Sequence, residues 1–294
     1  MKILILGCKG QLGLCLNDQL GFEDYEVFYT SRDQIDISNL EITKDKILQI
    51  CPDVIVNASA FTAVDQAEEK KEAADRINNI AVANIASICN EINCWLIHIS
   101  SDYVFDGNSH IAYKEKDKPN PKGIYGQTKL DGDIAIQQSG CKFIIIRTAW
   151  VYSEYGNNFL KTMLSLGLER DELSIVSDQI GCPTYAQDIA KVIISIFKYL
   201  HKKNDIVGIY NYAGSYGCSW AEFAEDIFDE AIKKNIIRDK PKIIKIKTFE
   251  FPTLAKRPMR SELDCSKIKE VFEINPSDYK KGIFLALEAY KKQA

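Results

Sequence analysis

The chain opens with the stretch that decides its fold, Ile3-Leu4-Ile5-Leu6-Gly7-Cys8-Lys9-Gly10-Gln11-Leu12-Gly13. A short apolar run leads into a GxxGxxG turn, and a helical pattern follows the turn. Glycine allows a tight turn and close approach of the backbone to a pyrophosphate, while the N-terminus of the next helix supplies unpaired N–H groups and a positive dipole. Because strand, turn and helix come in this order, Gly7, Gly10 and Gly13 predict a nucleotide-binding site.

The first half of the chain alternates short apolar runs with longer amphipathic stretches, from Lys2 to about Arg147. This alternation is typical of strand-helix-strand units that build a parallel sheet, whose strands are almost wholly apolar because both faces are covered. The predicted strands are Ile3–Leu6, Glu26–Thr30, Val54–Asn57, Trp95–Ser100 and Phe143–Arg147. We therefore expect an α/β fold with a Rossmann-like, doubly wound parallel sheet.

The second half loses the strict alternation after Trp150. Helices are predicted over residues 72–91 in the first half and over 159–168, 185–199, 220–234 and 278–291 in the second. A loop over residues 106–123 in the first half would overhang the site. We expect residues 1–150 to form an NAD(P)-binding Rossmann domain, to which a segment near 185–212 returns. Residues 151–184 and 213–294 would form most of a smaller, mixed α/β substrate-binding domain.

The composition is that of a globular protein that is neither a nucleic-acid binder nor a membrane protein. The 294 residues are 46% hydrophobic and 27% charged, with a net charge of −4. A protein that binds the phosphate backbone of nucleic acids usually carries a basic face. No apolar run reaches the ~18 residues that span a bilayer, and the first apolar stretch is too short for a signal peptide. We expect a cytoplasmic protein.

The cysteines and histidines predict neither a disulfide framework nor a metal site. Nine cysteines are dispersed without a CxxC pair, so we expect reduced thiols, mostly buried. The three histidines, His98, His110 and His201, share no metal-ligand spacing. His98 lies inside an apolar run, and we interpret it as a packed core residue.

The residues after the second predicted strand bear on the choice of cofactor. An acidic residue is expected here to hold the adenosine ribose hydroxyls, but the sequence reads Thr30-Ser31-Arg32-Asp33. Ser31 and Arg32 could hold a 2′-phosphate and favour NADPH, whereas Asp33 could hold the two hydroxyls and favour NADH. We expect NADPH as the cofactor, with NADH also accepted.

Three residues predict a carbonyl-reduction site. Ser101 follows the fourth predicted strand, and Tyr125 and Lys129 lie four residues apart at the start of a predicted helix. That spacing places both side chains on one helix face, where an ammonium can stabilise a tyrosinate and lower the phenol pKa from about 10. Ser101 can donate a hydrogen bond to a substrate carbonyl, because ligands of open α/β sheets bind at the carboxyl ends of the strands.

The order Gly7-x-x-Gly10-x-x-Gly13, Ser101 and Tyr125-x-x-x-Lys129 resembles the extended short-chain dehydrogenase/reductases. Longer stretches resemble one family among them, the dTDP-4-dehydrorhamnose reductases, over nearly the whole chain. These stretches are Gly10–Gly13, Asn57–Glu68, Ser101–Gly107, Arg147–Tyr152, Gly156–Met163, Asp178–Thr184 and Lys256–Pro258. The resemblance is weakest from about Phe197 to Ile246.

The resemblance implies roles for further residues. Gly10, Gln11 and Leu12 would lie along the pyrophosphate, Asp36 and Ile37 would flank the adenine, and Ala60, Phe61 and Thr62 would line the cofactor cleft. Asp102, Tyr103 and Trp150 would face the sugar, Asn158 and Arg257 would meet the nucleotide, and Asn78 would hold the backbone of the active-site strand.

The chain departs from the family pattern at three positions. Ser101 replaces the usual threonine and keeps its hydroxyl, and Ser59 replaces a common alanine. Some relatives dimerise through a metal held by glutamates, one of them in the first helix, where this chain has Cys15. We therefore carry over neither that metal nor that dimer, and expect a monomer or a homodimer.

The implied activity is reduction of the C4 keto group of dTDP-4-dehydro-β-L-rhamnose, a dTDP-sugar, by NAD(P)H to give dTDP-L-rhamnose. Another NAD(P)-dependent nucleotide-sugar reductase or epimerase is one alternative, since the three reaction-centre residues do not separate them. A non-catalytic, NADP-binding regulatory subunit, like that of methionine adenosyltransferase, is the other. The intact Ser101, Tyr125 and Lys129 speak against the regulatory subunit.

Overall fold

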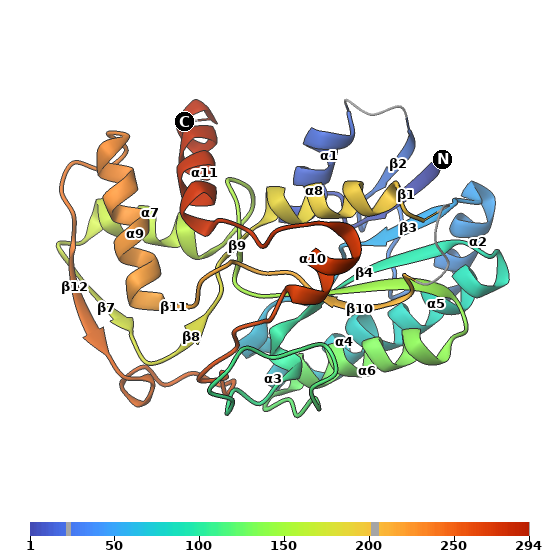
Figure 1. The fold of residues 1–294 in the computed structure, drawn as a ribbon, viewed down its shortest axis with the longest axis horizontal. Coiled ribbons are helices and arrows are strands. Elements are labelled where there is room, and N and C mark those ends of the chain that lie inside the picture. The colour runs from blue at the N-terminus through green and yellow to red at the C-terminus, as the bar shows by residue number, and fades with distance from the viewer. Residues whose placement is uncertain (22–24, 201–205, 294) are drawn as a thin grey trace.

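A six-stranded parallel sheet forms the larger part of the protein in a computed structural model that describes residues 1–21, 25–200 and 206–293 (Figure 1). The strand order is β10-β5-β4-β3-β1-β2. The strands are β1 (Lys2–Leu6), β2 (Glu26–Thr30), β3 (Val54–Asn57), β4 (Trp95–Ser101), β5 (Lys142–Thr148) and β10 (Gly208–Asn211). The predicted doubly wound α/β fold and all five predicted strands are confirmed, and β10 is a sixth strand that pairs with β5.

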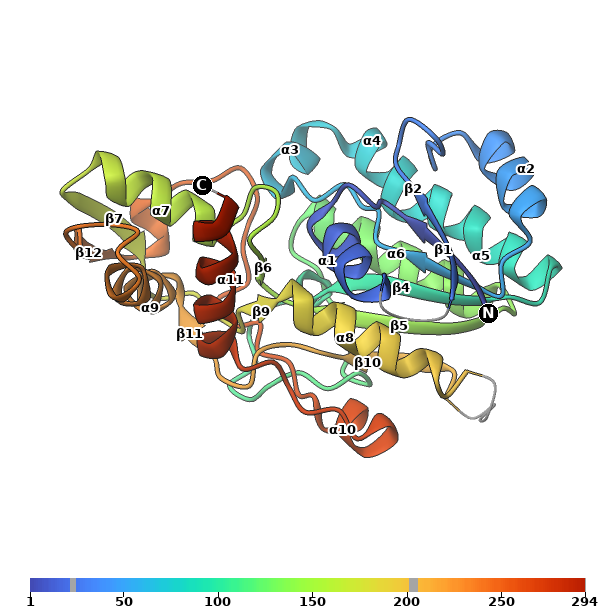
Figure 2. The same ribbon diagram turned by 90° about the horizontal axis from the view of Figure 1, so that it is seen from above.

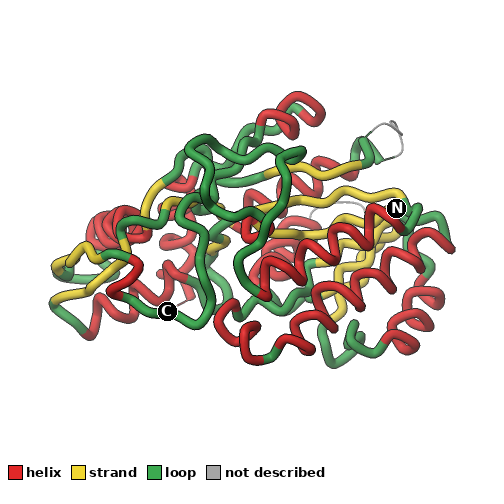
Figure 3. The backbone as a smooth tube through the Cα atoms, turned by 90° about the horizontal axis from the view of Figure 1, so that it is seen from below, coloured by secondary structure: helices red, strands yellow, loops and turns green. Residues whose placement is uncertain are grey.

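Helices cover both faces of this sheet, which explains why its strands are almost wholly apolar. One face packs against α1 (Gln11–Leu20), α8 (Ala186–Phe197) and α10 (Ser266–Phe272). The other packs against α2 (Leu40–Ile50), α5 (Ala81–Glu91) and α6 (Ile124–Gln138). Figure 1 shows the two layers above and below the strands, and Figure 3 shows the second layer from its own side.

The strand order reverses between β1 and β3, and that point positions the candidate site. β2 lies on one side of β1 and β3 on the other, with Leu6 opposite Asn57 at the carboxyl ends. The connections that leave β1 and β3 therefore run to opposite faces, and a crevice opens between them. The GxxGxxG turn lies at this crevice because it directly follows Leu6.

The helix predicted over residues 72–91 is a continuous helical stretch with a wider turn inside it. It comprises α4 (Lys71–Asp75), a π-helical turn η1 (Arg76–Ile80) and α5, and the short helix α3 (Val64–Glu69) precedes it. A π-helical turn inserts one residue into the helical repeat and is frequent at functional sites. Here it carries Asn78, which is buried.

The smaller part lies beyond the carboxyl ends of the sheet strands (Figure 2). Its hydrophobic core includes Tyr152, Leu160, Phe223, Phe228 and Leu287. Its helices are α7 (Phe159–Glu169), α9 (Trp220–Lys233) and α11 (Tyr279–Gln293). Three short strand pairs accompany them: β6 (Val151–Tyr152) pairs with β9 (Thr184–Tyr185), β7 (Glu172–Val176) pairs with β12 (Lys242–Ile246), and β8 (Ile180–Gly181) pairs with β11 (Cys218–Ser219). The division of the chain into two domains at the expected boundaries stays a prediction.

Two short 3₁₀ turns flank the junction between the parts: η2 (Asp102–Val104) and η3 (Thr248–Glu250). The predicted loop over 106–123 is irregular apart from a single bridge between Tyr113 and Leu263. All nine cysteines are free thiols and seven are buried, as expected. Within the described ranges, no helix has the length and apolar character needed to cross a membrane. His201 lies outside the described residues.

We predict that Gly13→Ala destabilises the fold. A Cβ atom at this position would collide with the Gly7 carbonyl oxygen and the Cys8 backbone, and neither can move without opening the turn. Overpacking of this kind costs about 3 kcal/mol, measured as the free energy of unfolding in urea.

The matched control is Gly21→Ala at the end of the same helix. Its Cβ would meet only the Asn17 carbonyl oxygen at 3.5 Å, so stability should change by less than about 0.5 kcal/mol. Equal losses in the two variants would contradict the close-approach explanation for Gly13.

Candidate active site

The GxxGxxG turn has the geometry of an anion site. Gly7 has φ +86°, and a Cβ there would lie 2.7 Å from the Ser59 side-chain oxygen. The N–H groups of Gly7 and Cys8 both donate to the Thr30 carbonyl, at 3.0 and 3.1 Å, which holds the turn against β2. No side chain caps the N-terminus of α1 at Gly10, so its first N–H groups are available to a phosphate. These residues fit the pyrophosphate of a dinucleotide.

Charged pairs surround the place expected for the adenosine ribose. Arg32 Nε lies 3.3 Å from Asp36 Oδ2, and Lys9 Nζ lies 2.7 Å from Asp33 Oδ2. Exposed pairs of this kind contribute little to stability, so a ligand can displace them at low cost. Ser31 is buried and Ile37 is buried beside Asp36. The roles of Ser31, Arg32, Asp36 and Ile37 stay predictions, as does Asp33 in NADH preference.

The segment after β3 is held in place by Asn78. Its Oδ1 accepts from the Phe61 N–H at 2.8 Å, and its Nδ2 donates to the Phe61 carbonyl at 3.1 Å. Nδ2 also lies 3.2 Å from Thr128 Oγ1 on α6. Asn78 therefore fixes the Ala60-Phe61-Thr62 segment rather than the expected strand β4, because the π-helical turn that carries it lies against this segment.

The structure brings Ser101 and Tyr125 together. Ser101 ends β4, and Tyr125 lies in the first turn of α6. The Ser101 hydroxyl is close enough to the Tyr125 phenol to lower its pKa. Ser101 Oγ also donates to Asp102 Oδ1 at 3.0 Å and accepts from the Tyr103 N–H at 3.2 Å. The Tyr103 ring meets the Tyr125 ring edge-on at 5.4 Å.

The expected lowering of the Tyr125 pKa is wrong for this structure. Burial raises the pKa of Tyr125 to about 12, and the nearby Ser101 hydroxyl offsets only part of that rise. The physical reason is the direction in which the Lys129 side chain points. Its Nζ donates to the Ile99 carbonyl at 2.6 Å and lies 3.1 Å from His98 Nε2. Burial lowers the pKa of Lys129 to about 8, and Asp133 opposes this.

A buried ion pair lies one turn beyond Lys129. Arg147 Nε lies 3.1 Å from Asp133 Oδ2, and both residues are at most 1% exposed. Arg147 also lies over the Phe105 ring at 5.2 Å. Removing one partner of such a pair typically costs about 3–5 kcal/mol because the other charge stays buried. The pair therefore fixes α6 against β5.

Trp150 lies at the border between the two parts. Its φ is +46°, an unusual backbone for a large side chain. Its ring stacks on Trp220 with centroids 3.4 Å apart and planes 4° from parallel, and Trp220 Nε1 donates to Gln179 Oε1 at 3.2 Å. Contact of Trp150 with a sugar stays a prediction.

Asn158 and Arg257 both bind protein partners. Asn158 caps α7, and its Nδ2 donates to Gln11 Oε1 at 2.9 Å. Arg257 makes two hydrogen bonds to Asp65, at 2.7 and 3.2 Å, and so joins the segment after η3 to α3. Their expected contacts with the nucleotide stay predictions.

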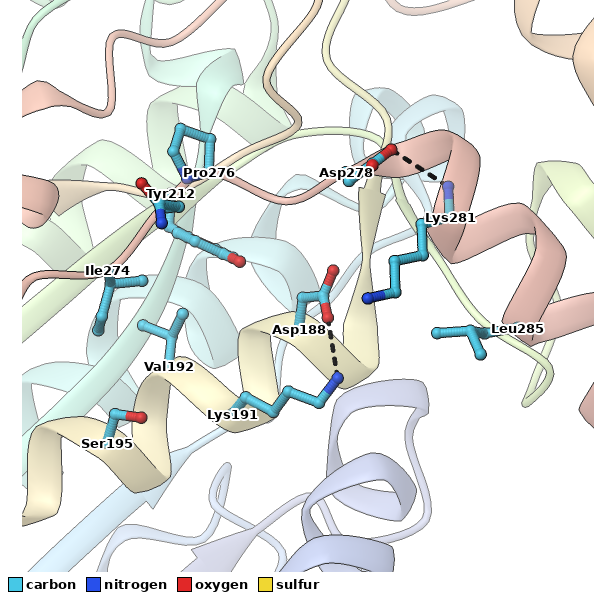
Figure 4. Close-up of a pocket in the computed structure, with 11 residues that line it drawn as sticks. Asp188, Lys191, Val192, Ser195, Tyr212, Ile274, Pro276, Asp278, Lys281 and Leu285 are labelled. Carbon is cyan, nitrogen blue, oxygen red and sulfur yellow. Dashed lines mark hydrogen bonds and ion pairs between the residues drawn. The ribbon is translucent and has the colours of Figure 1, made fainter.

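A separate hollow lies away from these residues. It measures about 290 Å³ and lies between α8, α11 and the segment over residues 274–278 (Figure 4). Lys191 Nζ lies 3.2 Å from Asp188 Oδ1 in this hollow, and the backbone N–H of Lys281 donates to Asp278 Oδ1. It brings none of the predicted site residues together. Among the described residues, no three His, Cys, Asp or Glu side chains form a group that could hold a metal ion.

Sequence reasoning missed four functional or supporting residues. Asp133 follows Lys129 by four residues, and that helical spacing could have identified it. His98 is buried as expected. Its contact with Lys129 joins β4 to α6, and no local sequence pattern predicts a contact between residues 31 positions apart on two different elements. The pairing of Asp65 with Arg257 and the stacking of Trp220 on Trp150 are equally non-local.

Known proteins resemble the chain over its whole length. The family model described as RmlD substrate binding domain matches residues 1–292. The dTDP-4-dehydrorhamnose reductase of Aggregatibacter actinomycetemcomitans is 41% identical over 284 residues, which cover 96% of this chain and 97% of that protein. The crystal structure of the Bacillus anthracis str. Ames dTDP-4-dehydrorhamnose reductase in complex with NADP has a TM-score of 0.89 at 34% identity, covering 100% of this chain and 99% of that one. The Clostridium acetobutylicum ortholog has a TM-score of 0.91 at 34% identity, covering 99% and 100%.

We predict that Asp102→Asn changes how stability depends on pH. Burial raises the pKa of Asp102 from 3.8 to about 6. A raised carboxyl pKa contributes stability that is fully present below the unfolded value and is lost as the pH rises through the folded value. Between pH 4 and 7, the free energy of unfolding in urea should therefore change by about 2 kcal/mol in favour of the variant relative to the unchanged protein.

The control is Asp171→Asn, which removes an exposed carboxyl. Its unfolding free energy should follow that of the unchanged protein across the same range. A constant difference between Asp102→Asn and the unchanged protein from pH 4 to 7 would mean that Asp102 does not titrate in this window.

Proposed function

The chain belongs to the RmlD substrate binding domain family, and we propose that it reduces the C4 keto group of dTDP-4-dehydro-β-L-rhamnose with NADPH to give dTDP-L-rhamnose. This is a reaction of nucleotide-sugar and cell-surface polysaccharide biosynthesis. The observation that carries the proposal is the placing of Ser101 beside Tyr125 at the carboxyl end of β4, in a chain 41% identical to a named reductase of this kind.

Tyr125 is suited to donate the proton. With a pKa of about 12 the phenol is protonated at neutral pH, so it can give its proton to the developing C4 oxygen. Ser101, which lies beside the same phenol, can donate to the same oxygen. NADPH supplies the hydride when bound. The Gly7–Gly13 turn would hold its pyrophosphate, and Lys129 its nicotinamide ribose.

The remaining binding roles follow the family resemblance. Ser31 and Arg32 would favour the 2′-phosphate of NADPH, while Asp33 would let NADH be accepted. Tyr103 and Trp150 would face the sugar of a dTDP-sugar. We propose that the protein acts in the cytoplasm as a monomer or homodimer, without nucleic acid or membrane as a partner.

We predict that Tyr125→Phe removes most turnover. Loss of a general acid typically lowers the rate by ~10²–10⁴-fold. The measurement is the loss of nicotinamide absorbance with NADPH or NADH and enzymatically generated dTDP-4-dehydro-L-rhamnose. NADPH binding, followed by fluorescence, should be retained because the turn is untouched.

The matched control is Tyr216→Phe, a tyrosine that is 71% exposed in the smaller part and should leave kcat unchanged. Full kcat in Tyr125→Phe would exclude it as the proton donor. NADPH binding without net oxidation would instead indicate an epimerase, a different keto-sugar or a regulatory subunit, since an epimerase consumes no stoichiometric cofactor.

A further inference from the structure

The backbone of Trp220 is fixed at the border between the two parts. Trp220 begins α9 directly after β11, whose antiparallel pairing with β8 sets Ser219 opposite Ile180. A capping box closes this end of the helix: Ser219 Oγ accepts from the Glu222 N–H at 3.2 Å, and Glu222 Oε2 accepts from the Ser219 N–H at 2.7 Å. Such a box satisfies two backbone donors that a helix otherwise leaves free, so the first turn of α9 is held in place.

The indole of Trp220 is held by its own partners. Its Nε1 donates to Gln179 Oε1 at 3.2 Å, and the Phe159 ring packs against it with centroids 4.6 Å apart. Gln179 is buried, and its Nε2 lies 3.1 Å from Thr248 Oγ1, which donates to Asp178 Oδ1 at 2.7 Å. Because the Thr248 hydroxyl gives its single proton to Asp178, it accepts from the Gln179 amide, and Oε1 is left for the indole.

Trp150, by contrast, has a conformation that neither its backbone nor its ring adopts readily. Its φ of +46° lies in the left-handed region, which large side chains avoid. Its ring lies face to face with that of Trp220, at 3.4 Å and 4° from parallel, whereas aromatic pairs prefer offset or edge-on contacts. A Cβ atom at Gly181 would collide with the same indole. Strained conformations persist only where the surroundings hold them, and they cluster at functional sites.

The strained indole follows the strand that lies beside the reaction centre. Trp150 comes two residues after Thr148, which the register of β5 with β4 sets opposite Ser101. Both stacked indoles are only half-buried, whereas the third tryptophan of the chain, Trp95, is 4% exposed in the core of the sheet. The pair therefore keeps aromatic surface open where the smaller part meets the carboxyl ends of the strands.

We propose that Trp220 is a positioning residue that holds the Trp150 indole in its strained place, so that the sugar of the substrate meets a ring whose position is already set. A binding group that is held in its bound conformation does not have to be ordered when the ligand arrives, which strengthens binding. The effect on the sugar rests on the proposed reductase function, whereas the holding of Trp150 does not.

The holding of the ring is tested without any substrate. In protein labelled with 5-fluorotryptophan, the three ¹⁹F resonances are assigned by single Trp→Phe variants, and their transverse relaxation reports ring motion. Trp150 should relax as fast as Trp95 in the unchanged protein and in Trp220→Phe, which keeps an aromatic plane. In Trp220→Leu the Trp150 resonance should relax severalfold more slowly, as a mobile ring does, while Trp95 stays the same.

The effect on the sugar is tested by a double-mutant cycle. Trp220→Leu should raise KM for dTDP-4-dehydro-L-rhamnose roughly tenfold, the equivalent of one aromatic contact, and leave KM for NADPH unchanged. The fall in kcat should be smaller, since the contact serves the bound sugar before and during the reaction. Trp150→Leu with Trp220→Leu should be no worse than Trp150→Leu alone, because a residue that acts through Trp150 then has nothing left to position.

Two further variants make the result specific. Phe228→Leu removes a buried ring from the same helix, so it should lower stability and leave both KM values unchanged. Gly181→Ala provides a second route should Trp220→Leu fail to fold, because its Cβ displaces the Trp150 indole while both tryptophans stay. It should raise KM for the sugar as Trp220→Leu does.

The outcomes separate this inference from the proposed function. Additive effects in the cycle, or an equal rise of KM in Phe228→Leu, would overturn the action of Trp220 through Trp150. A Trp150 resonance that keeps its fast relaxation in Trp220→Leu would overturn the holding of the ring. Absence of turnover in the unchanged protein would overturn the reductase function, and the relaxation of Trp150 would still decide whether Trp220 holds it.

Discussion

The parallel register of β4 between β3 and β5 is the constraint on which the site depends. It places His98 opposite Asn57 on one side, and Ser101 opposite Thr148 on the other. Side chains alternate between the two faces of a strand, so a slip of one residue would move each of them to the wrong face. The apolar residues of β4, buried against both helix layers, oppose that slip. Hydrophobic burial therefore fixes the position of polar groups that contribute no hydrophobic stabilisation themselves.

Desolvation controls the chemistry of these polar groups. Tyr125, Lys129 and Asp133 share α6, and burial shifts each pKa toward the neutral form. For Tyr125 this shift favours the protonated phenol. For Lys129 it lowers the pKa of the ammonium to about 8, close to neutral pH. Buried polar groups must be paired, since an unpaired charge costs several kcal/mol. Lys129 meets that requirement through His98 and Ile99, and Asp133 Oδ2 meets it through Arg147, whereas Asp133 Oδ1 has no hydrogen-bond partner.

Some of the contacts that join the two parts involve predicted binding residues. Gln11 of the phosphate turn accepts from Ser153 and Asn158, and Arg257 binds Asp65. A ligand that competes for Gln11 or Arg257 must exchange these contacts.

The sequence by itself determined the sheet and the GxxGxxG turn, and it indicated Tyr125 as the proposed proton donor. Each is encoded locally: apolar runs of strand length, glycines at fixed spacing, and Tyr125 four residues before Lys129. Family resemblance added the substrate. Only the tertiary structure decided the surroundings of Lys129, because His98 and Asn57 come from two different strands and meet it only through the register. It also reversed the expected shift of the Tyr125 pKa, since helical spacing predicts which side chains share a face but not how deeply they are buried or where an ammonium points.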